Sequence, residues 1–101
     1  MMKLLDMVKH PEWITVDNLY ALKDCLDNRR DWLEEREPES SGLVYDEWEM
    51  RFEDWNELCE FCDEIIEMID SGQDYKEQIE YLADDILSFH YTYRGLSRLK
   101  V

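Results

Sequence analysis

The feature that most limits how this chain can fold is an unbroken series of apolar residues between positions 45 and 69. Its members recur at steps of three and four, the spacing that places side chains on one side of an α-helix. They are Tyr45, Trp48, Phe52, Trp55, Cys59, Cys62, Ile66 and Ile69. A second row, made of Leu58, Phe61, Ile65 and Met68, is confined to the C-terminal half. That half must bury two sides, as the middle helix of a bundle does.

Similar spacing predicts two further long helices. We expect the first over residues 16–36 with Thr15 as its N-cap, the middle one over 44–70, and the last over 74–93. The apolar face of the first consists of Val16, Leu19, Leu22, Leu26 and Leu33, and that of the last of Tyr75, Ile79, Leu82, Ile86, Phe89, Tyr93 and Leu96. Asp46 with Glu49, and Asp74 with Glu77, have capping-box spacing at the two later helix starts.

Residues 3–9 are expected to form an additional short helix that ends before Pro11, with Trp13 and Ile14 packing on the bundle. Three glycines and two prolines in 101 residues leave little material for turns. Short connections between long helices favour antiparallel neighbours. The expected fold is therefore all-α: a single domain over residues 1–101, built as an antiparallel, up-down-up three-helix bundle with the short N-terminal helix added.

The first residues lack the pattern of a secretory signal, and no uncharged run is long enough to span a membrane. Three cysteines, an odd number, are then most simply read as reduced thiols in the cytoplasm. We therefore expect a cytoplasmic protein.

Charge is concentrated in the middle of the chain. The net charge is −15, and residues 31–70 hold 16 acidic residues against Arg36 and Arg51, a balance of −14. Such a field repels nucleic acid and anionic membranes and attracts basic surfaces. Direct binding to nucleic acid or to a membrane is therefore not expected, and a basic protein is the expected partner.

Projected at 100° per residue, seven carboxylates form a band on the middle helix opposite the apolar series. They are Asp46, Glu49, Glu53, Glu57, Glu60, Glu64 and Glu67. Successive carboxylates are about 5 Å apart along the axis, comparable with the phosphate spacing of a nucleic-acid strand. Arg51 alone is placed to pair within this helix, with Glu47 or Asp54. The band is either a surface kept acidic for solubility or a preformed negative surface that docks on a basic groove.

The Cys59-x-x-Cys62 pair allows three interpretations. With Cys25 and either His10 or His90 it could complete a zinc site, and alone it could be a redox dithiol. However, both cysteines fall in mid-helix among acidic residues, where a thiol is unreactive, so core packing is favoured. A metal- or thiol-dependent module built on Cys25, Cys59 and Cys62 remains an alternative function, and no cofactor is expected.

Catalytic motifs are absent from the sequence. Neither histidine belongs to a metal-ligand motif, and no nucleophile elbow, EF-hand loop or Walker sequence occurs. Carboxylates on a solvated face do no acid–base work. The protein is therefore not expected to be an enzyme.

Large aromatic residues are numerous for a bundle of this size. Trp48, Phe52 and Trp55 are most simply core residues, but three large rings in succession are hard to bury. Trp32 lies off the main apolar face of its helix. Trp48 and Trp32 are therefore candidate anchors, either for a partner or for a homodimer in which the charge serves only solubility.

In composition the chain resembles the small acidic helical proteins of phages and mobile elements. These include DNA-mimicking antirestriction and anti-CRISPR inhibitors and the immunity proteins that neutralise nuclease toxins. The resemblance involves no motif and implies a role for no particular residue. It agrees with an inhibitor that occludes a nuclease or another nucleic-acid-binding protein. The chain is expected to be a monomer or a homodimer.

Overall fold

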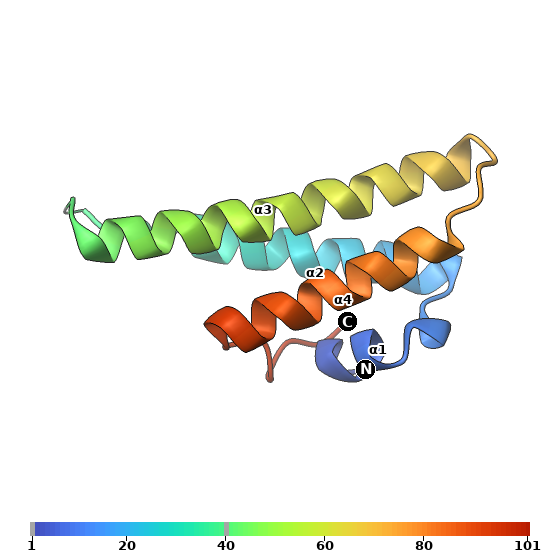
Figure 1. The fold of residues 1–101 in the computed structure, drawn as a ribbon, viewed down its shortest axis with the longest axis horizontal. Helices are drawn as coiled ribbons and strands as arrows, with labels where there is room; N and C mark the ends of the chain where they lie inside the picture. The colour runs from blue at the N-terminus through green and yellow to red at the C-terminus, as the bar shows by residue number, and fades with distance from the viewer. Residues whose placement is uncertain (1, 40) are drawn as a thin grey trace.

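The computed structural model describes residues 2–39 and 41–101, and these form helices joined by short connections. In chain order they are α1 (Leu4–Lys9), the 3₁₀ helix η1 (Pro11–Trp13), α2 (Val16–Glu34), α3 (Leu43–Asp70) and α4 (Lys76–Tyr93) (Figure 1). The predicted all-α class and the helical bundle with an additional N-terminal helix are confirmed.

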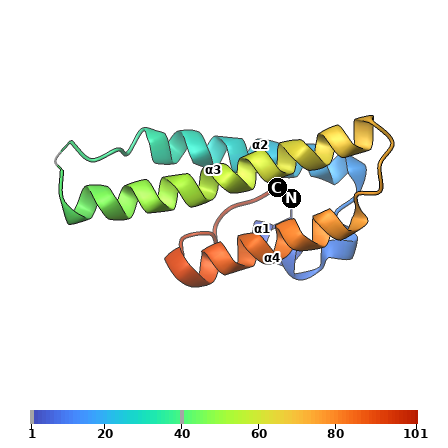
Figure 2. The same cartoon turned by 45° about the horizontal axis from the view of Figure 1, so that its top comes forward.

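The longest helix, α3, is the centre of the arrangement. It packs against α2 on one side and against α4 on another, and α1 packs against α4 (Figures 1 and 2). The two ends of the chain lie side by side, because Lys3 and Lys100 form an antiparallel β-bridge. The Leu4 N–H donates to the Leu99 carbonyl at 2.9 Å, and the Val101 N–H donates to the Met2 carbonyl at 2.8 Å.

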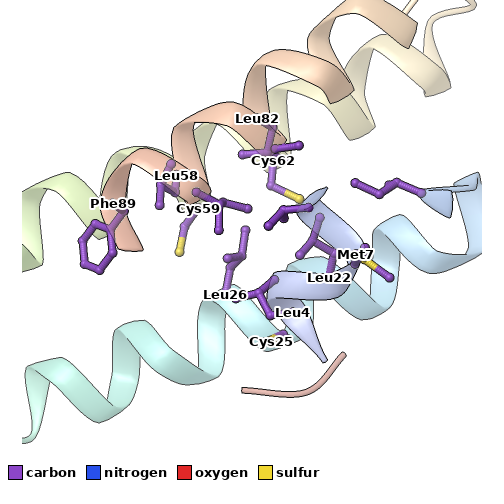
Figure 3. Close-up of a cluster of buried hydrophobic side chains, with 14 of the residues drawn as sticks. Leu4, Met7, Leu22, Cys25, Leu26, Leu58, Cys59, Cys62, Leu82 and Phe89 are labelled. Carbon is purple, nitrogen blue, oxygen red and sulfur yellow. The ribbon is translucent and has the colours of Figure 1, made fainter. Parts of the chain in front are cut away.

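The short helix α1 is part of the core. Leu4, Met7 and Val8 are at most 2% exposed, as fully buried as the best-buried residues of the long helices. Leu4 and Met7 belong to the same cluster of buried side chains as Leu22 of α2 and Leu82 of α4 (Figure 3). Their burial supplies apolar area that three helices alone would lack.

Burial along α3 is uneven. The buried residues Trp55, Leu58, Cys59, Cys62 and Ile65 all lie in its middle. Tyr45, Trp48 and Phe52 are only half-buried, although they continue the same apolar series. The prediction that two sides are buried in the C-terminal half agrees with the burial of Leu58 and Ile65 beside Cys59 and Cys62.

The predicted helix starts are only partly correct. Thr15 is the N-cap of α2, and its side-chain oxygen accepts the Asn18 N–H at 3.2 Å. The capping box at Asp46 and Glu49 is wrong, because α3 begins at Leu43 and Asp46 already lies within its first turn.

The second capping box is wrong as well. Helix α4 begins at Lys76, two residues later than predicted, with Tyr75 at the N-cap and no side-chain cap. Asp74 instead accepts the Lys76 N–H at 3.2 Å, a local turn that precedes the helix. Helix α2 ends at Glu34, because the chain turns at residues 35 and 36.

The segment before α2 departs from the prediction at one residue. Ile14 is buried in the core, but Trp13 is 43% exposed. The Trp13 ring stacks on His10, with ring centroids 4.1 Å apart. The expected packing of Trp13 on the bundle is therefore wrong.

Candidate interaction surface on the acidic helix

One side of α3 is a continuous row of exposed carboxylates. We call this row the acidic face, and it consists of Asp46, Glu49, Glu53, Glu57, Glu60, Glu64 and Glu67. All seven side chains are exposed. Trp55, Cys59 and Cys62 are buried on the opposite side, so the core fixes which way the carboxylates point.

Basic side chains do not neutralise the acidic face. Across residues 2–39 and 41–101, the ion pairs within 4 Å are His10–Glu12, Lys23–Asp27, Lys23–Asp63 and Arg30–Asp27. None of them includes a residue of the acidic face. Among the described residues, the one side-chain hydrogen bond to a carboxylate of this row comes from Asn56 Nδ2, which donates to Glu60 Oε1 at 3.1 Å. No basic side chain in the described ranges therefore offsets the charge of the row.

Arg51 does not form either of its predicted pairs. No ion pair joins it to Glu47 or to Asp54 in the described chain, and its guanidinium instead lies 5.5 Å from the centre of the Tyr93 ring. Asp54 accepts a hydrogen bond from the Tyr93 hydroxyl at 2.5 Å. The single base within α3 is thus turned toward α4, away from the acidic face.

A shallow groove of about 290 Å³ runs between α3 and α4 beside the acidic face. Its lining has an apolar part, Leu58 and Phe89, and a polar part, Asp54, Glu57, Asp85, Ser88, Thr92 and Tyr93. The hydrogen bond to Asp54 raises the pKa of Tyr93 to about 12. Partial burial, and secondarily Asp84, raises the pKa of Asp85. The groove combines acceptors with an apolar floor, which suits the aliphatic stem and charged end of a lysine or arginine.

The two tryptophans proposed as anchors do not lie on the acidic face. The Trp48 N–H donates to the Leu33 carbonyl of α2 at 2.8 Å, so the ring faces α2 and is half-buried. Trp32 is 37% exposed on α2. The structure thus separates the aromatic candidates from the carboxylates that they were expected to assist.

Two arginine side chains lie over the ring of Trp32. The guanidiniums of Arg29 and Arg36 lie 3.6 and 3.9 Å from the centre of its ring. Partial burial lowers the pKa of Arg29, and the nearby charges of Arg36 and Arg51 lower it further. Three of the protein's 11 bases thus gather at one place in a strongly acidic protein.

The cysteines lie in the core. Cys25, Cys59 and Cys62 are free thiols and all are buried (Figure 3). Burial raises the pKa of Cys59 and of Cys62 to about 12, and it raises that of Cys25 as well. Within the described ranges, no three His, Cys, Asp or Glu side chains form a group that could hold a metal ion. The set Cys25, Cys59 and Cys62 is therefore not brought together as metal ligands.

Comparisons of this chain with protein-family models, with curated proteins and with solved structures find no match. Its function must therefore be argued from its own residues. None of the described helices is both long enough and apolar enough to cross a membrane.

Two features of this surface were missed in the sequence. The groove between α3 and α4 depends on how these two helices pack together, and no local sequence pattern predicts it. The arginine cluster did have a signal, because Arg29, Trp32 and Arg36 are spaced by three and four residues within the helix predicted over residues 16–36. Arg51 joins them from α3 only through the tertiary structure.

Proposed function

We propose that this protein is a non-enzymatic inhibitor that binds a basic, nucleic-acid-binding protein and occludes its nucleic-acid site. The expected partner is a nuclease or another protein that binds nucleic acid, as in the anti-CRISPR, antirestriction and immunity classes. The proposal places both proteins in the cytoplasm of a cell or of a phage-infected host. No chemistry on a substrate is part of the mechanism.

The unpaired carboxylates of the acidic face carry this proposal. Like charges three or four residues apart on a helix each cost a few tenths of a kcal/mol, and surface helices usually mix lysine with glutamate. Here the repulsion extends over the exposed length of α3. A net charge of −15 also exceeds the magnitude of about 2–8 that suffices to keep a small domain soluble.

Binding would proceed in two physical stages. The field of the acidic face first steers the protein onto a positively charged groove, which raises the association rate and makes it sensitive to salt. A lysine or arginine of the partner then enters the groove between α3 and α4, where Asp54, Glu57 and Asp85 accept its hydrogen bonds. Carboxylates about 5 Å apart would occupy positions on the partner that otherwise bind phosphates.

The test is capture of the partner from a lysate of the native host at low salt, with elution by a salt gradient. A variant with Glu53, Glu57, Glu60 and Glu64 changed to glutamine should keep its helix content and no longer capture the partner. A matched control removes four exposed charges elsewhere, by Asp6→Asn, Glu12→Gln, Asp17→Asn and Asp24→Asn, and should bind nearly as the parent does.

The captured protein must also lose its nucleic-acid binding when the parent chain is added. Retention of the partner by the four-glutamine variant would contradict the proposal. So would a partner that binds nucleic acid equally well in the complex.

A further inference from the structure

The start of α3 extends beyond the end of α4 (Figures 1 and 2). Apolar side chains on this part of α3 are exposed. Leu43, Val44 and Met50 are 81%, 66% and 60% exposed. Farther along the same side of α3, Leu58 and Ile65 are buried where α4 packs. The cover ends because α4 ends at Tyr93, which contacts Asp54. An apolar helix side without its neighbour is typical of an interaction surface.

This uncovered end also contains a cavity of about 250 Å³ between α2 and α3. Trp32 and Arg36 line it from the side of α2, and Val44, Trp48 and Arg51 line it from α3. We refer to Trp32, Arg36, Leu43, Val44, Met50 and Arg51 as the hairpin tip. Its composition, rich in Trp, Arg and exposed aliphatic residues, is that of an interface centre.

The arginines at this end of the molecule are not paired with carboxylates in the described chain. In the described part of the chain no ion pair includes Arg29, Arg36 or Arg51. The chain holds 26 acidic residues, so these charges are unpaired despite an excess of acids. The lowered pKa of Arg29 agrees with guanidiniums that repel one another in partly desolvated positions. A surface that covered the tip would be expected to bring carboxylates with it.

We propose that the hairpin tip is a homodimer interface, in which two copies of this protein pack their tips together about a two-fold axis. The tip complements itself, since Glu37, Glu39 and Glu47 are exposed at the same end as the arginines. A two-fold axis places such carboxylates of each copy against Arg36 and Arg51 of the other. The apolar residues Leu43, Val44 and Met50 of both copies then cover one another.

This inference is independent of the proposed function. At 100° per residue, Val44 and Arg51 point away from the acidic face, whereas Leu43 and Met50 lie at its border near Asp46 and Glu53. A tip-to-tip dimer therefore leaves the part of each acidic face from Glu57 to Glu67 open. The two associations also respond to salt in opposite ways. Two copies at −15 repel each other, and salt screens this repulsion, shortening the Debye length from about 10 Å at 0.1 M to about 3 Å at 1 M. Salt also screens the pairs that Arg36 and Arg51 form across the interface, but exposed ion pairs contribute little to stability, so relief of the net repulsion outweighs their loss. Salt therefore strengthens the dimer and weakens binding to a basic partner.

The test is sedimentation equilibrium of the full chain over micromolar to millimolar concentrations, at about 0.1 M and about 1 M salt. We expect a species of twice the 12.4 kDa chain mass, favoured by higher salt. Val44→Glu puts a charge into the interface at a residue that is exposed in the monomer, so folding should persist while the dissociation constant rises at least about tenfold. Arg36→Gln should weaken the dimer less.

The matched control is Tyr20→Glu, at a residue 46% exposed near the start of α2, the opposite end of that helix from Trp32, which should leave the dissociation constant unchanged. A chain that remains monomeric at millimolar concentration in high salt overturns the proposal. A dimer that Val44→Glu leaves intact, or that Tyr20→Glu dissociates, does so too. Failure here leaves the salt-sensitive capture of a basic partner unaffected.

Discussion

The indole N–H of Trp55 donates a hydrogen bond of 2.8 Å to the backbone carbonyl of Leu26, joining α3 to α2 inside the core. The Trp55 ring is fully buried. Its other side meets Phe89 of α4 in an edge-to-face arrangement, with centroids 4.9 Å apart. One side chain thus contacts both neighbours of the central helix, and it orients the acidic face relative to them.

The first prediction concerns this residue. Trp55→Phe should lower the free energy of unfolding by about 1–3 kcal/mol, because it removes a buried hydrogen bond and leaves unfilled volume. Trp48→Phe is the matched control, since Trp48 makes an equivalent 2.8 Å bond to Leu33 but is only half-buried. Urea unfolding followed by circular dichroism measures both. Equal losses in the two variants would show that burial does not set the contribution of Trp55.

The second prediction concerns the thiols. A thiol whose pKa is raised by folding stabilises the protein below its unfolded pKa of about 8.5, and this contribution is lost as pH rises through the folded value. For Cys59 and Cys62 that folded value is about 12. At pH 8 a thiolate-specific reagent should therefore react slowly with the native protein and rapidly with all three thiols in urea. Cys25, the most exposed of the three at 9%, should react first, and Cys25→Ala should remove that first phase. Fast native labelling of Cys62 would contradict this account.

The fold could be predicted largely because α3 and α4 repeat apolar residues at regular steps. That pattern identifies a helix and its buried side without reference to any partner. The ends of the helices could be predicted less well, since Asp46 and Asp74 match the capping-box pattern but neither caps its helix in the structure. At the first place the helix extends one turn further, to Leu43, and at the second the Asp74 side chain accepts the Lys76 N–H in a turn ahead of the helix.

The candidate surface, too, could be predicted from the sequence only in part. The acidic face follows from periodicity, because seven carboxylates opposite a buried series must be exposed once the series is buried. The positions of Trp32 and Trp48 could not be predicted, since they depend on contacts between helices. The clearest example is the bond from Trp48 to Leu33, which joins residues 15 apart in the chain.

The third prediction concerns Lys23, which links α2 to α3. Its ammonium lies 2.8 Å from Asp27 and 2.5 Å from Asp63, and hydrogen bonds to these two carboxylates raise its pKa above the usual range. Because these side chains are partly exposed, we expect Lys23→Gln to lower the free energy of unfolding by only about 1 kcal/mol at neutral pH.

High salt should reduce this loss. The raised pKa means that the contribution of Lys23 is present at neutral pH and is lost only in strong alkali, above the unfolded pKa. Lys76→Gln, at an exposed lysine with no ion pair among the described residues, is the control and should change stability little. Urea unfolding at two salt concentrations measures each variant. An unchanged loss at high salt would mean that Lys23 acts through its aliphatic stem.

The fourth prediction tests whether the acidic face has a cost to folding. Glu53, Glu57, Glu60 and Glu64 take part in seven like-charged pairs at spacings of three or four residues, three among themselves and four with Glu49, Asp54, Asp63 and Glu67. Each pair is unfavourable by about 0.2–0.5 kcal/mol, so changing all four residues to glutamine should raise the free energy of unfolding by about 1–3 kcal/mol at low salt. The gain should shrink at 1 M salt, where the Debye length is about 3 Å.

The control for this comparison is the variant carrying Asp6→Asn, Glu12→Gln, Asp17→Asn and Asp24→Asn. It lowers the net negative charge by the same amount but removes favourable neighbours. Glu12 lies 3.4 Å from His10, and Asp17 lies in the first turn of α2, where a negative charge favours the helix. We expect no gain in stability from this variant. A gain in stability equal to that of the glutamine variant would assign the effect to net charge alone. A gain seen only in the glutamine variant would mean that the acidic face lowers the stability of the protein, as expected of a row of charges kept for binding.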